Sequence, residues 1–448
     1  MKKVITYGTY DLLHQGHINL LRRAKELGDY LIVGVTNDNF DRERGKLNVC
    51  NNVLERVEAV KATGLADQII IEDYFGQKID DVQKYNVDIF AIGSDWEGKF
   101  DYLNEYCKVV YLERTQGVSS TELRNRKREI RIGVVGESLV INKFARESQY
   151  VNGIKLVGVC TKAPENLDSH LSSIPYITDS YNELLEYVEA VFILSHPSKH
   201  YRHIKTALEK GIHVLYESPM TLQLEQCREL LALARSKGCV LSEGIKTAYS
   251  TAYNRLILLA KSGAIGDIVS VDAVCTSLQQ LDFADTRGLA LIWNSMTGWA
   301  PTGLLPIFQL LGTAYTSKQI ISRLGNAELG FDSFSKISFL YPGAVASVLV
   351  GKGIKSEGHL VISGTKGYLY VPSPWWKTEY FELRFENPQE NRRYFYQLDG
   401  EGIRYEILAF VRAIDKNQHL NIATCISEKI VEVMESFSSQ DSSCVLLK

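Results

Sequence analysis

Short runs typical of β-strands alternate with segments of helical periodicity, and this alternation starts twice along the chain. The first series begins near Val4, and the second begins at Ile130 and opens with the run Ile132-Gly133-Val134-Val135-Gly136. Parallel strands need a long crossover, usually a helix, so each series predicts a parallel sheet covered by helices. The restart predicts a domain boundary near residue 129, and no stretch rich in Pro, Gly or Ser separates the two series.

The first series has candidate strands at residues 4–7, 30–36, 68–72, 88–92 and 109–112. The second has them at residues 130–136, 155–160, 190–195, 213–216 and 240–241, with helical segments up to about residue 263. Later runs, at residues 269–276, 337–340, 344–350, 359–363 and 367–371, are separated by turn residues, as in antiparallel sheets. We expect an α/β chain with Rossmann-like domains at 1–128 and 129–263 and an α+β domain with an open antiparallel sheet at 264–448.

Composition limits the kind of protein. A chain of 448 residues with 45% hydrophobic content is long enough for two or three domains with cores of their own. A net charge of -3 gives no basic surface for nucleic acid or anionic membranes. The eight cysteines are scattered without metal-ligand spacing, and too few apolar residues follow Met1-Lys2-Lys3 for a signal peptide. No apolar run approaches the roughly 20 residues that span a membrane, so we expect a cytoplasmic protein.

Two histidines three residues apart follow the first candidate strand, in the segment Tyr7-Gly8-Thr9-Tyr10-Asp11-Leu12-Leu13-His14-Gln15-Gly16-His17. Residues i and i+3 share a face at the first turn of a helix, where free amides and the helix dipole favour phosphate. His14 and His17 could therefore donate to the same phosphate oxygens. An isolated pair of this kind is more often a surface helix cap, and both interpretations stay open on this segment alone.

Other motifs extend the pattern through the first domain. They are Gly8-Thr9-Tyr10-Asp11, Gly93-Ser94-Asp95-Trp96-Glu97-Gly98-Lys99-Phe100-Asp101 and Arg114-Thr115-Gln116-Gly117-Val118-Ser119-Ser120-Thr121. With the histidine pair, they make residues 1–128 resemble the glycerol-3-phosphate cytidylyltransferases of the HxGH nucleotidyltransferase superfamily. The resemblance implies CMP transfer from CTP, with Mg²⁺, to glycerol 3-phosphate or a related polyol phosphate. The products would be pyrophosphate and a CDP-polyol for a surface polymer such as teichoic acid or capsule.

The resemblance also assigns roles to individual residues. Catalytic roles fall to His14, His17, Arg114 and Lys46. Nucleotide binding falls to Thr9, Tyr10, Asp11, Gly16, Asp95, Arg114, Thr115, Ser119, Ser120 and Thr121, and the acceptor phosphate to Arg44, Lys46, Arg56 and Asp67. A solvated charged loop is the alternative for the basic stretch Arg42-Glu43-Arg44-Gly45-Lys46. A further arginine of the family falls at Gly64, which leaves the identity of the polyol open.

Residues 129–448 resemble the glucose-fructose oxidoreductase and inositol dehydrogenase family. Its motifs match residues 132–136, 156–160, 195–200, 217–219, 242–244 and 263–267. The resemblance implies an NAD(P)-binding domain at 129–263 and, in common with such dehydrogenases, a homodimer or higher homo-oligomer. Candidate cofactor residues are Gly136, Ser138, Thr161, Lys162 and Glu217.

The dinucleotide fingerprint is incomplete. Of its three glycines, the chain keeps Gly136 and has Ser138 and Ile141 at the other two positions. The acidic residue that binds the ribose is replaced by Thr161, followed by Lys162. This pair could favour NADP over NAD, and it could equally be a surface turn.

The family's catalytic residues are missing as well. Ser218 stands where the family has a lysine, and residues 301–305 lack the family's aspartate and histidine. Lys246, Tyr249 or His196 could substitute as proton donor. We favour a non-catalytic module for dimerisation or docking, and the alternative is an NAD(P)-dependent reductase that makes the polyol phosphate.

Overall fold

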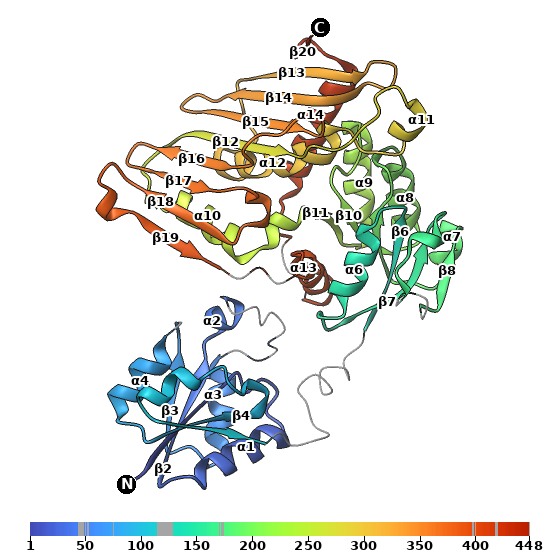
Figure 1. The fold of residues 1–448 in the computed structure, drawn as a ribbon. Helices are drawn as coiled ribbons and strands as arrows, with labels where there is room; N and C mark the ends of the chain where they lie inside the picture. The colour runs from blue at the N-terminus through green and yellow to red at the C-terminus, as the bar shows by residue number, and fades with distance from the viewer. Residues whose placement is uncertain are drawn as a thin grey trace. The chain divides into compact units, whose positions relative to one another are not determined.

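The computed structural model describes the whole chain except residues 44–48, 50, 52, 75, 114–128, 170, 172–173, 397, 399, 417–419 and 448. It forms two compact units, Met1–Glu129 and Ile130–Lys448 (Figure 1). None of the helices in the described part of the chain has the length and hydropathy needed to span a bilayer.

The first unit is built on a five-stranded parallel sheet with the order β3-β2-β1-β4-β5. Its strands are β1 (Lys3–Gly8), β2 (Tyr30–Thr36), β3 (Gln68–Glu72), β4 (Ile89–Gly93) and β5 (Lys108–Leu112). Its helices are α1 (Gln15–Lys25), α2 (Asp38–Glu43), α3 (Val53–Ala62) and α4 (Gln77–Tyr85). The chain runs outward from β1 to β3 on one side and from β4 to β5 on the other, so the topological switch point lies between β1 and β4.

Two apolar layers cover this sheet, because successive side chains of a strand point to opposite faces. Val4 packs with Leu21 and Ala24 of α1 on one face, whereas Ile5 packs with Phe90 and Val82 on the other. The five strands predicted from the sequence are confirmed, with β2 and β3 at the predicted bounds, β1 and β4 different by one residue at both ends and β5 at one end.

The second unit contains a six-stranded parallel sheet with the order β11-β10-β9-β6-β7-β8. Its strands are β6 (Ile130–Gly136), β7 (Ile154–Cys160), β8 (Tyr176–Thr178), β9 (Ala190–Leu194), β10 (His213–Glu217) and β11 (Leu241–Gly244). The helices that follow them are α6 (Val140–Ser148), α7 (Tyr181–Leu184), α8 (Pro197–Glu209), α9 (Leu224–Lys237) and α10 (Thr251–Lys261). The switch point of this sheet lies between β6 and β9.

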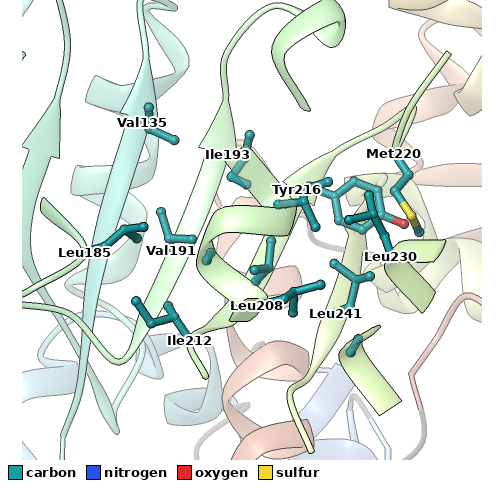
Figure 2. Packing of buried hydrophobic residues seen from close by; sticks show 14 of the residues in the cluster. Val135, Leu185, Val191, Ile193, Leu208, Ile212, Tyr216, Met220, Leu230 and Leu241 are labelled. Atoms are coloured by element: carbon teal, nitrogen blue, oxygen red, sulfur yellow. The ribbon is translucent and has the colours of Figure 1, made fainter. Parts of the chain in front are cut away.

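The core of this half lies between the strands and helices α8 and α9 (Figure 2). Strand residues Val191, Ile193 and Tyr216 meet Leu208 of α8 and Leu230 of α9 there. All five side chains are at most 1% exposed, so they form a closely packed core.

A nine-stranded sheet forms the other half of this unit, with the order β19-β18-β17-β16-β12-β15-β14-β13-β20. Its strands are β12 (Ile268–Thr276), β13 (Ser317–Asn326), β14 (Phe331–Leu340), β15 (Val345–Gly351), β16 (Leu360–Gly364), β17 (Tyr368–Val371), β18 (Tyr380–Arg384), β19 (Arg392–Phe395) and β20 (Cys444–Leu447). The sheet is mixed rather than purely antiparallel as expected, because β12 pairs parallel with β15 and β13 pairs parallel with β20.

Helices join the two halves of the second unit. Helix α12 (Ser295–Leu311) packs on β12, β14 and β15, and the short α11 (Thr286–Leu289) precedes it. Helix α13 (Ile403–Lys416) packs on α6, and α14 (Thr424–Ser439) packs on α9 and α12. The end of the chain therefore returns to the nucleotide-fold half.

Candidate active site

The histidine pair of the first unit lies at the carboxyl edge of the sheet, beside the switch point. Strand β1 ends at Gly8, and α1 begins at Gln15 with His14 as its N-cap. The rings of His14 and His17 stack, with centroids 4.0 Å apart and planes inclined by 25°. Open α/β sheets bind ligands at such an edge, where the strand order reverses.

Hydrogen bonding decides which nitrogen of His14 can donate. Its Nδ1 accepts from the amide of Gly16 at 3.1 Å, so a neutral ring carries its proton on Nε2. The ring of Tyr10 contacts His17 edge-on, with centroids 5.5 Å apart. The N–H of His14 and the first amides of α1 thus form one group of donors suited to phosphate.

The loop that carries these groups has an unusual backbone. Tyr10 and Leu12 have positive φ angles of 52° and 47°, a region that costs of order 1–3 kcal/mol for residues other than glycine. A Cβ at Gly8 would lie 2.9 Å from the ring of Tyr10. Glycine at position 8 therefore lets the buried tyrosine fold back over the strand end.

A buried arginine holds this loop in place. The guanidinium of Arg56, in α3, donates to the carbonyl of Thr9 at 2.7 Å and pairs with Asp38 at 2.5 Å and Asp41 at 3.1 Å. The hydroxyl of Thr9 donates to Asp41 at 3.0 Å. Because these contacts use the guanidinium within the protein, the structure gives Arg56 a positioning role, and its direct contact with an acceptor phosphate stays a prediction.

A cavity of about 620 Å³ opens beside the loop. It is lined by Tyr10, Leu12, Leu13, Asn51, Glu55, Arg56 and Ala59. Asp11 lies next to this wall, 3% exposed, and accepts from the amide of Asn51 at 2.9 Å. Glu55 and Ala59 were not predicted from the sequence, although their spacing of four residues puts them on one face of α3 with Arg56.

Asp95 reaches the same edge from the other side of the switch point. Strand β4 ends at Gly93 and continues into a short 3-10 helix, Ser94–Trp96, that contains Asp95. Since β1 and β4 are adjacent and parallel, their carboxyl ends carry Thr9 to His17 and Asp95 side by side. The fold thus gathers the described nucleotide-binding candidates at one edge, and their contact with a nucleotide stays a prediction.

Asp67 is placed at the opposite edge of the sheet. It accepts from the amide of Leu31, at the start of β2, at 2.6 Å, and it forms an ion pair with Lys25 of α1. The histidine pair follows the end of β1, and β1 and β2 run parallel. The assignment of Asp67 to the acceptor phosphate is therefore corrected, because its carboxylate anchors the amino edge of the sheet.

Seven further candidates lie outside the described residues. They are Arg44, Lys46, Arg114, Thr115, Ser119, Ser120 and Thr121.

The second unit has a cavity of about 670 Å³ at the carboxyl edge of its parallel sheet, beside the switch point between β6 and β9. One wall comes from strand ends, loops and helix starts of the parallel-sheet half, with Gly136, Glu137, Ser138, Val140, Ala163, Asn166, Leu194, Ser195, His196, Ser198, Lys199 and Glu217. The other comes from the segment around α11 and α12 and the end of β15, with Ala290, Leu291, Ile292, Trp293, Gly298 and Lys352. The cavity is therefore shared by the two halves of this unit.

Two of the cofactor candidates line this cavity at the start of α6. A Cβ at Gly136 would lie 2.7 Å from the backbone of Leu194, so the glycine permits close packing of β6 on β9. The Ser138 hydroxyl accepts from the amide of Val140 at 3.2 Å. Thr161 is buried, and beyond it the wall is formed by Ala163 and Asn166 rather than by the exposed Lys162.

Carboxylates cluster at the end of β10. Glu217 lines the cavity, and burial raises its pKa, with Glu243 acting in the same direction and Lys246 opposing. Glu406, from α13, is 2% exposed, and burial together with Glu217 raises its pKa well above the usual range. The sequence did not predict Glu406, because α13 comes from the far end of the chain.

Ser218, which replaces the lysine of the family, is bonded within the protein. Its hydroxyl donates to Glu243 at 2.5 Å, and the other carboxylate oxygen of Glu243 accepts from Ser427 at 2.5 Å. Residues 301–305 lie in α12, where a Cβ at Gly303 would lie 2.5 Å from Val348. This stretch packs against the sheet and brings no acid–base side chain to the cavity.

The three proposed substitutes differ in position. His196 lines the cavity, and burial followed by the charge of Lys199 lowers its pKa. Tyr249 is buried and donates to the carbonyl of Glu243, while Lys246 lies 3.9 Å from Glu401. Of these three candidate proton donors, His196 is the one found among the described residues that line the cavity.

Family models match both units. Residues 5–126 match the cytidylyltransferase-like family, and residues 130–245 match the oxidoreductase family with an NAD-binding Rossmann fold. Over 124 residues, or 28% of the chain, the sequence is 50% identical to the glycerol-3-phosphate cytidylyltransferases of Bacillus spizizenii and Staphylococcus aureus. These alignments cover 95% and 93% of those enzymes. The chain belongs to the cytidylyltransferase-like family. Its first unit is a nucleotidyltransferase, as the sequence predicted.

Solved structures resemble the second unit of this cytidylyltransferase-like protein. KijD10, a 3-ketoreductase from Actinomadura kijaniata solved with NADP and TDP-benzene, aligns with a TM-score of 0.62 at 17% identity, over 71% of this chain and 99% of that one. UDP-N-acetylglucosamine 3-dehydrogenase GnnA from Acidithiobacillus ferrooxidans aligns with a TM-score of 0.58 at 17% identity, over 69% and 99%. At these identities the likeness shows the fold, and it confirms the predicted oxidoreductase-like architecture.

Proposed function

We propose that the first unit transfers CMP from CTP to glycerol 3-phosphate or a closely related polyol phosphate. The observation that carries this proposal is the stacked pair of His14 and His17 at the first turn of α1, at the switch point of the sheet. The relatives that are 50% identical over 124 residues are named glycerol-3-phosphate cytidylyltransferases, which supports the proposal.

The chemistry suits these residues. An oxygen of the acceptor phosphate attacks the α-phosphorus of CTP, the bond to the β-phosphate breaks, and pyrophosphate leaves. Negative charge grows on the α-phosphoryl group and on the leaving group, so positioned donors lower the barrier without a covalent enzyme intermediate. In this proposal His14 and His17 donate to the phosphates, and Arg56 holds the backbone of their loop through its hydrogen bond to the carbonyl of Thr9.

Mg²⁺ is proposed to arrive on the triphosphate of CTP. Among the described residues there is no cluster of three or more His, Cys, Asp or Glu side chains that could hold a metal. Asp11 and Asp95 flank the phosphate edge from its two sides and are the carboxylates proposed to face the metal-bound nucleotide.

The product is proposed to be a CDP-polyol that supplies a phosphate-containing surface polymer such as teichoic acid or capsule. The reaction would then run in the cytoplasm, where CTP is made. Pyrophosphate release by the purified chain, measured with glycerol 3-phosphate and each of the four ribonucleoside triphosphates, tests the nucleotide. We expect CTP to be used at least tenfold better than the others, and a preference for ATP would overturn the assignment.

A second candidate function belongs to the second unit, and the cavity at its switch point favours it. We propose that a nicotinamide dinucleotide binds there, with its diphosphate at the start of α6 beside Gly136 and Ser138. When bound, this cofactor supplies hydride transfer. A reductase that makes the polyol phosphate would place successive steps on one chain and raise the local concentration of the intermediate.

Direct titration of the full chain with NADPH tests this candidate. Binding in the micromolar range supports it, and absence of binding by a chain that keeps its transferase activity leaves the second unit as a non-catalytic module. We further propose a homo-oligomer that associates through the nine-stranded sheet, where Val269 and Val345 are 39% and 51% exposed.

A further inference from the structure

The cavity of the second unit contains a lysine that the family's motifs do not include. Lys352 directly follows β15, in the half of the unit that carries the nine-stranded sheet, yet it lines the same cavity as His196 and Glu217 of the other half. Burying an ammonium group without a charged partner is unfavourable unless a ligand or a hydrogen-bond network compensates. The contacts of Lys352 therefore decide whether it serves the fold or a ligand.

The backbone of Lys352 is fixed by neighbouring groups. Its amide donates to the hydroxyl of Ser295 at 3.0 Å, and its carbonyl accepts from the amide of Gln279 at 2.9 Å. The Ser295 hydroxyl in turn donates to the carbonyl of Asp332 at 2.8 Å. These hydrogen bonds hold the backbone of Lys352 in place where the end of β15 meets the start of α12.

The side chain of Lys352 lies against Trp293 and Gly298. Its Nζ donates to the carbonyl of Trp293 at 2.5 Å, which uses one of the three N–H groups. A Cβ at Gly298 would lie 2.8 Å from Nζ and 2.9 Å from Cε, so the end of the Lys352 side chain lies close against the backbone at position 298. In the described residues no carboxylate lies within the 4.0 Å of an ion pair with Lys352, which leaves donors for a group that enters the cavity.

We propose that Lys352 binds an anionic oxygen of a small phosphate-bearing carbonyl compound in this cavity. Nothing in the family's motifs gives this chain a cation at that place, since Ser218 stands at the lysine position and is bonded to Glu243.

The electrostatics are suited to this role. Burial lowers the pKa of Lys352 to about 8, with the charge of Asp332 opposing this shift. Below this pKa the side chain carries the positive charge that pairs with an oxyanion. Lys352 also lowers the pKa of His196, so the two groups are close enough to influence each other's charge. Glu217 is the acidic group that faces the cavity from β10.

This proposal shares its cavity with the proposed dinucleotide site, and its test is kept separate. The full chain is pulse-labelled with acetic anhydride at pH 7.5, with and without dihydroxyacetone phosphate, and the acetylation of each lysine is quantified by mass spectrometry. We expect the probe to slow acetylation of Lys352 at least fivefold. Lys355, which is exposed a few residues further on, should react at the same rate in both samples.

Two variants separate ligand binding from general damage to the fold. Lys352→Met removes the ammonium, and Gly298→Ala crowds the flexible end of the Lys352 side chain while keeping the charge. Lys352→Met should weaken probe binding, measured by calorimetry, by about tenfold or more, which corresponds to about 1.4 kcal/mol, and Gly298→Ala should weaken it less. Gly343→Ala is the matched control, because a Cβ at Gly343 meets nothing within 4 Å.

Equal acetylation of Lys352 with and without the probe would overturn the proposal, as would unchanged binding in the Lys352→Met variant. Protection of Lys352 in a chain that does not bind NADPH would uphold the Lys352 site and remove the dinucleotide function. NADPH binding without protection of Lys352 would do the reverse.

Discussion

At the scale of single residues, the first site depends on a loop backbone that holds two rings in place. His14 caps α1 through its own Nδ1, and the strained residues Tyr10 and Leu12 lie just before it. The geometry is set before any substrate arrives, which is what electrostatic stabilisation of a transition state requires.

Replacement of either histidine tests this arrangement. We expect His14→Ala and His17→Ala each to lower kcat for CTP-dependent pyrophosphate release by roughly 10²–10³, the typical loss for one preorganised donor. Gln15→Ala is the matched control on the same turn, because Gln15 is exposed and its amide bonds Asn19. Rates within a factor of a few of the unmodified chain for both histidine variants would exclude them from catalysis.

Arg56 gives a prediction about stability. Arg56 is 1% exposed and forms an ion pair with Asp41, which is equally buried, so Arg56→Met removes one charge of a buried ion pair. Loss of one partner of such a pair costs about 3–5 kcal/mol in the free energy of unfolding. Lys61→Met, on the exposed side of the same helix, should change that energy by less than about 0.5 kcal/mol. Urea denaturation measures both, and equal small effects would show that Arg56 does not hold the loop.

Sequence reasoning found residues that sit in contiguous motifs and missed those that the fold brings together from afar. His14 was predicted from the histidine spacing after the first strand, and Asp95 from the motif that resembles the family. Lys352 was missed, since the segments that meet it in the cavity lie far from it in the chain, although a lysine directly after a buried strand is a signal that could have identified it. Asp67 was misassigned, because motif matching does not say at which end of a strand a residue lies.

At the scale of elements, the strands of the two parallel sheets were predicted except for the short β8, and β13, β18, β19 and β20 of the nine-stranded sheet were missed. Strand β13 was missed because its ten residues include only a few large apolar side chains. The parallel pairing of β12 with β15 was also not predicted from the sequence, because it depends on the crossover through α12 between the two strands.

Helix α13 carries a prediction about pH. It brings Glu406 against Glu217 and Lys246, and burial raises the pKa of Glu406 above its ordinary value of 4.5. A carboxyl group whose pKa is higher in the folded chain binds more protons when folded, so its stabilising effect is full below pH 4.5 and is lost as the pH rises through the folded pKa. Glu406→Gln should therefore raise the melting temperature more at pH 8 than at pH 5.

Differential scanning calorimetry at the two pH values measures this effect. Glu386→Gln is the control, because Glu386 is exposed at the end of β18. A Glu406→Gln variant that is destabilised equally at both pH values would show that the carboxyl group is not held in its protonated form.

At the scale of the whole molecule, the chain joins two units that the sequence distinguishes by the restart at Ile130. The first has His14, His17 and Asp95 at the carboxyl edge of its sheet, and the second has a cavity at the corresponding edge that is lined by His196, Glu217 and Lys352. The sequence could identify both families from their motifs. It could not show that α13 and α14 return to pack on α6 and α9, because that contact joins segments more than 180 residues apart.

The most direct test of the central claim is identification of the product formed by the full chain from CTP, glycerol 3-phosphate and Mg²⁺. Phosphorus NMR of the reaction mixture distinguishes the diphosphate group of a CDP-polyol from CTP and from free pyrophosphate. We expect CDP-glycerol and pyrophosphate to appear in equal amounts and to depend on His14 and His17. Hydrolysis of CTP to CMP without a CDP-polyol, or no reaction by a folded chain, would contradict the proposed function.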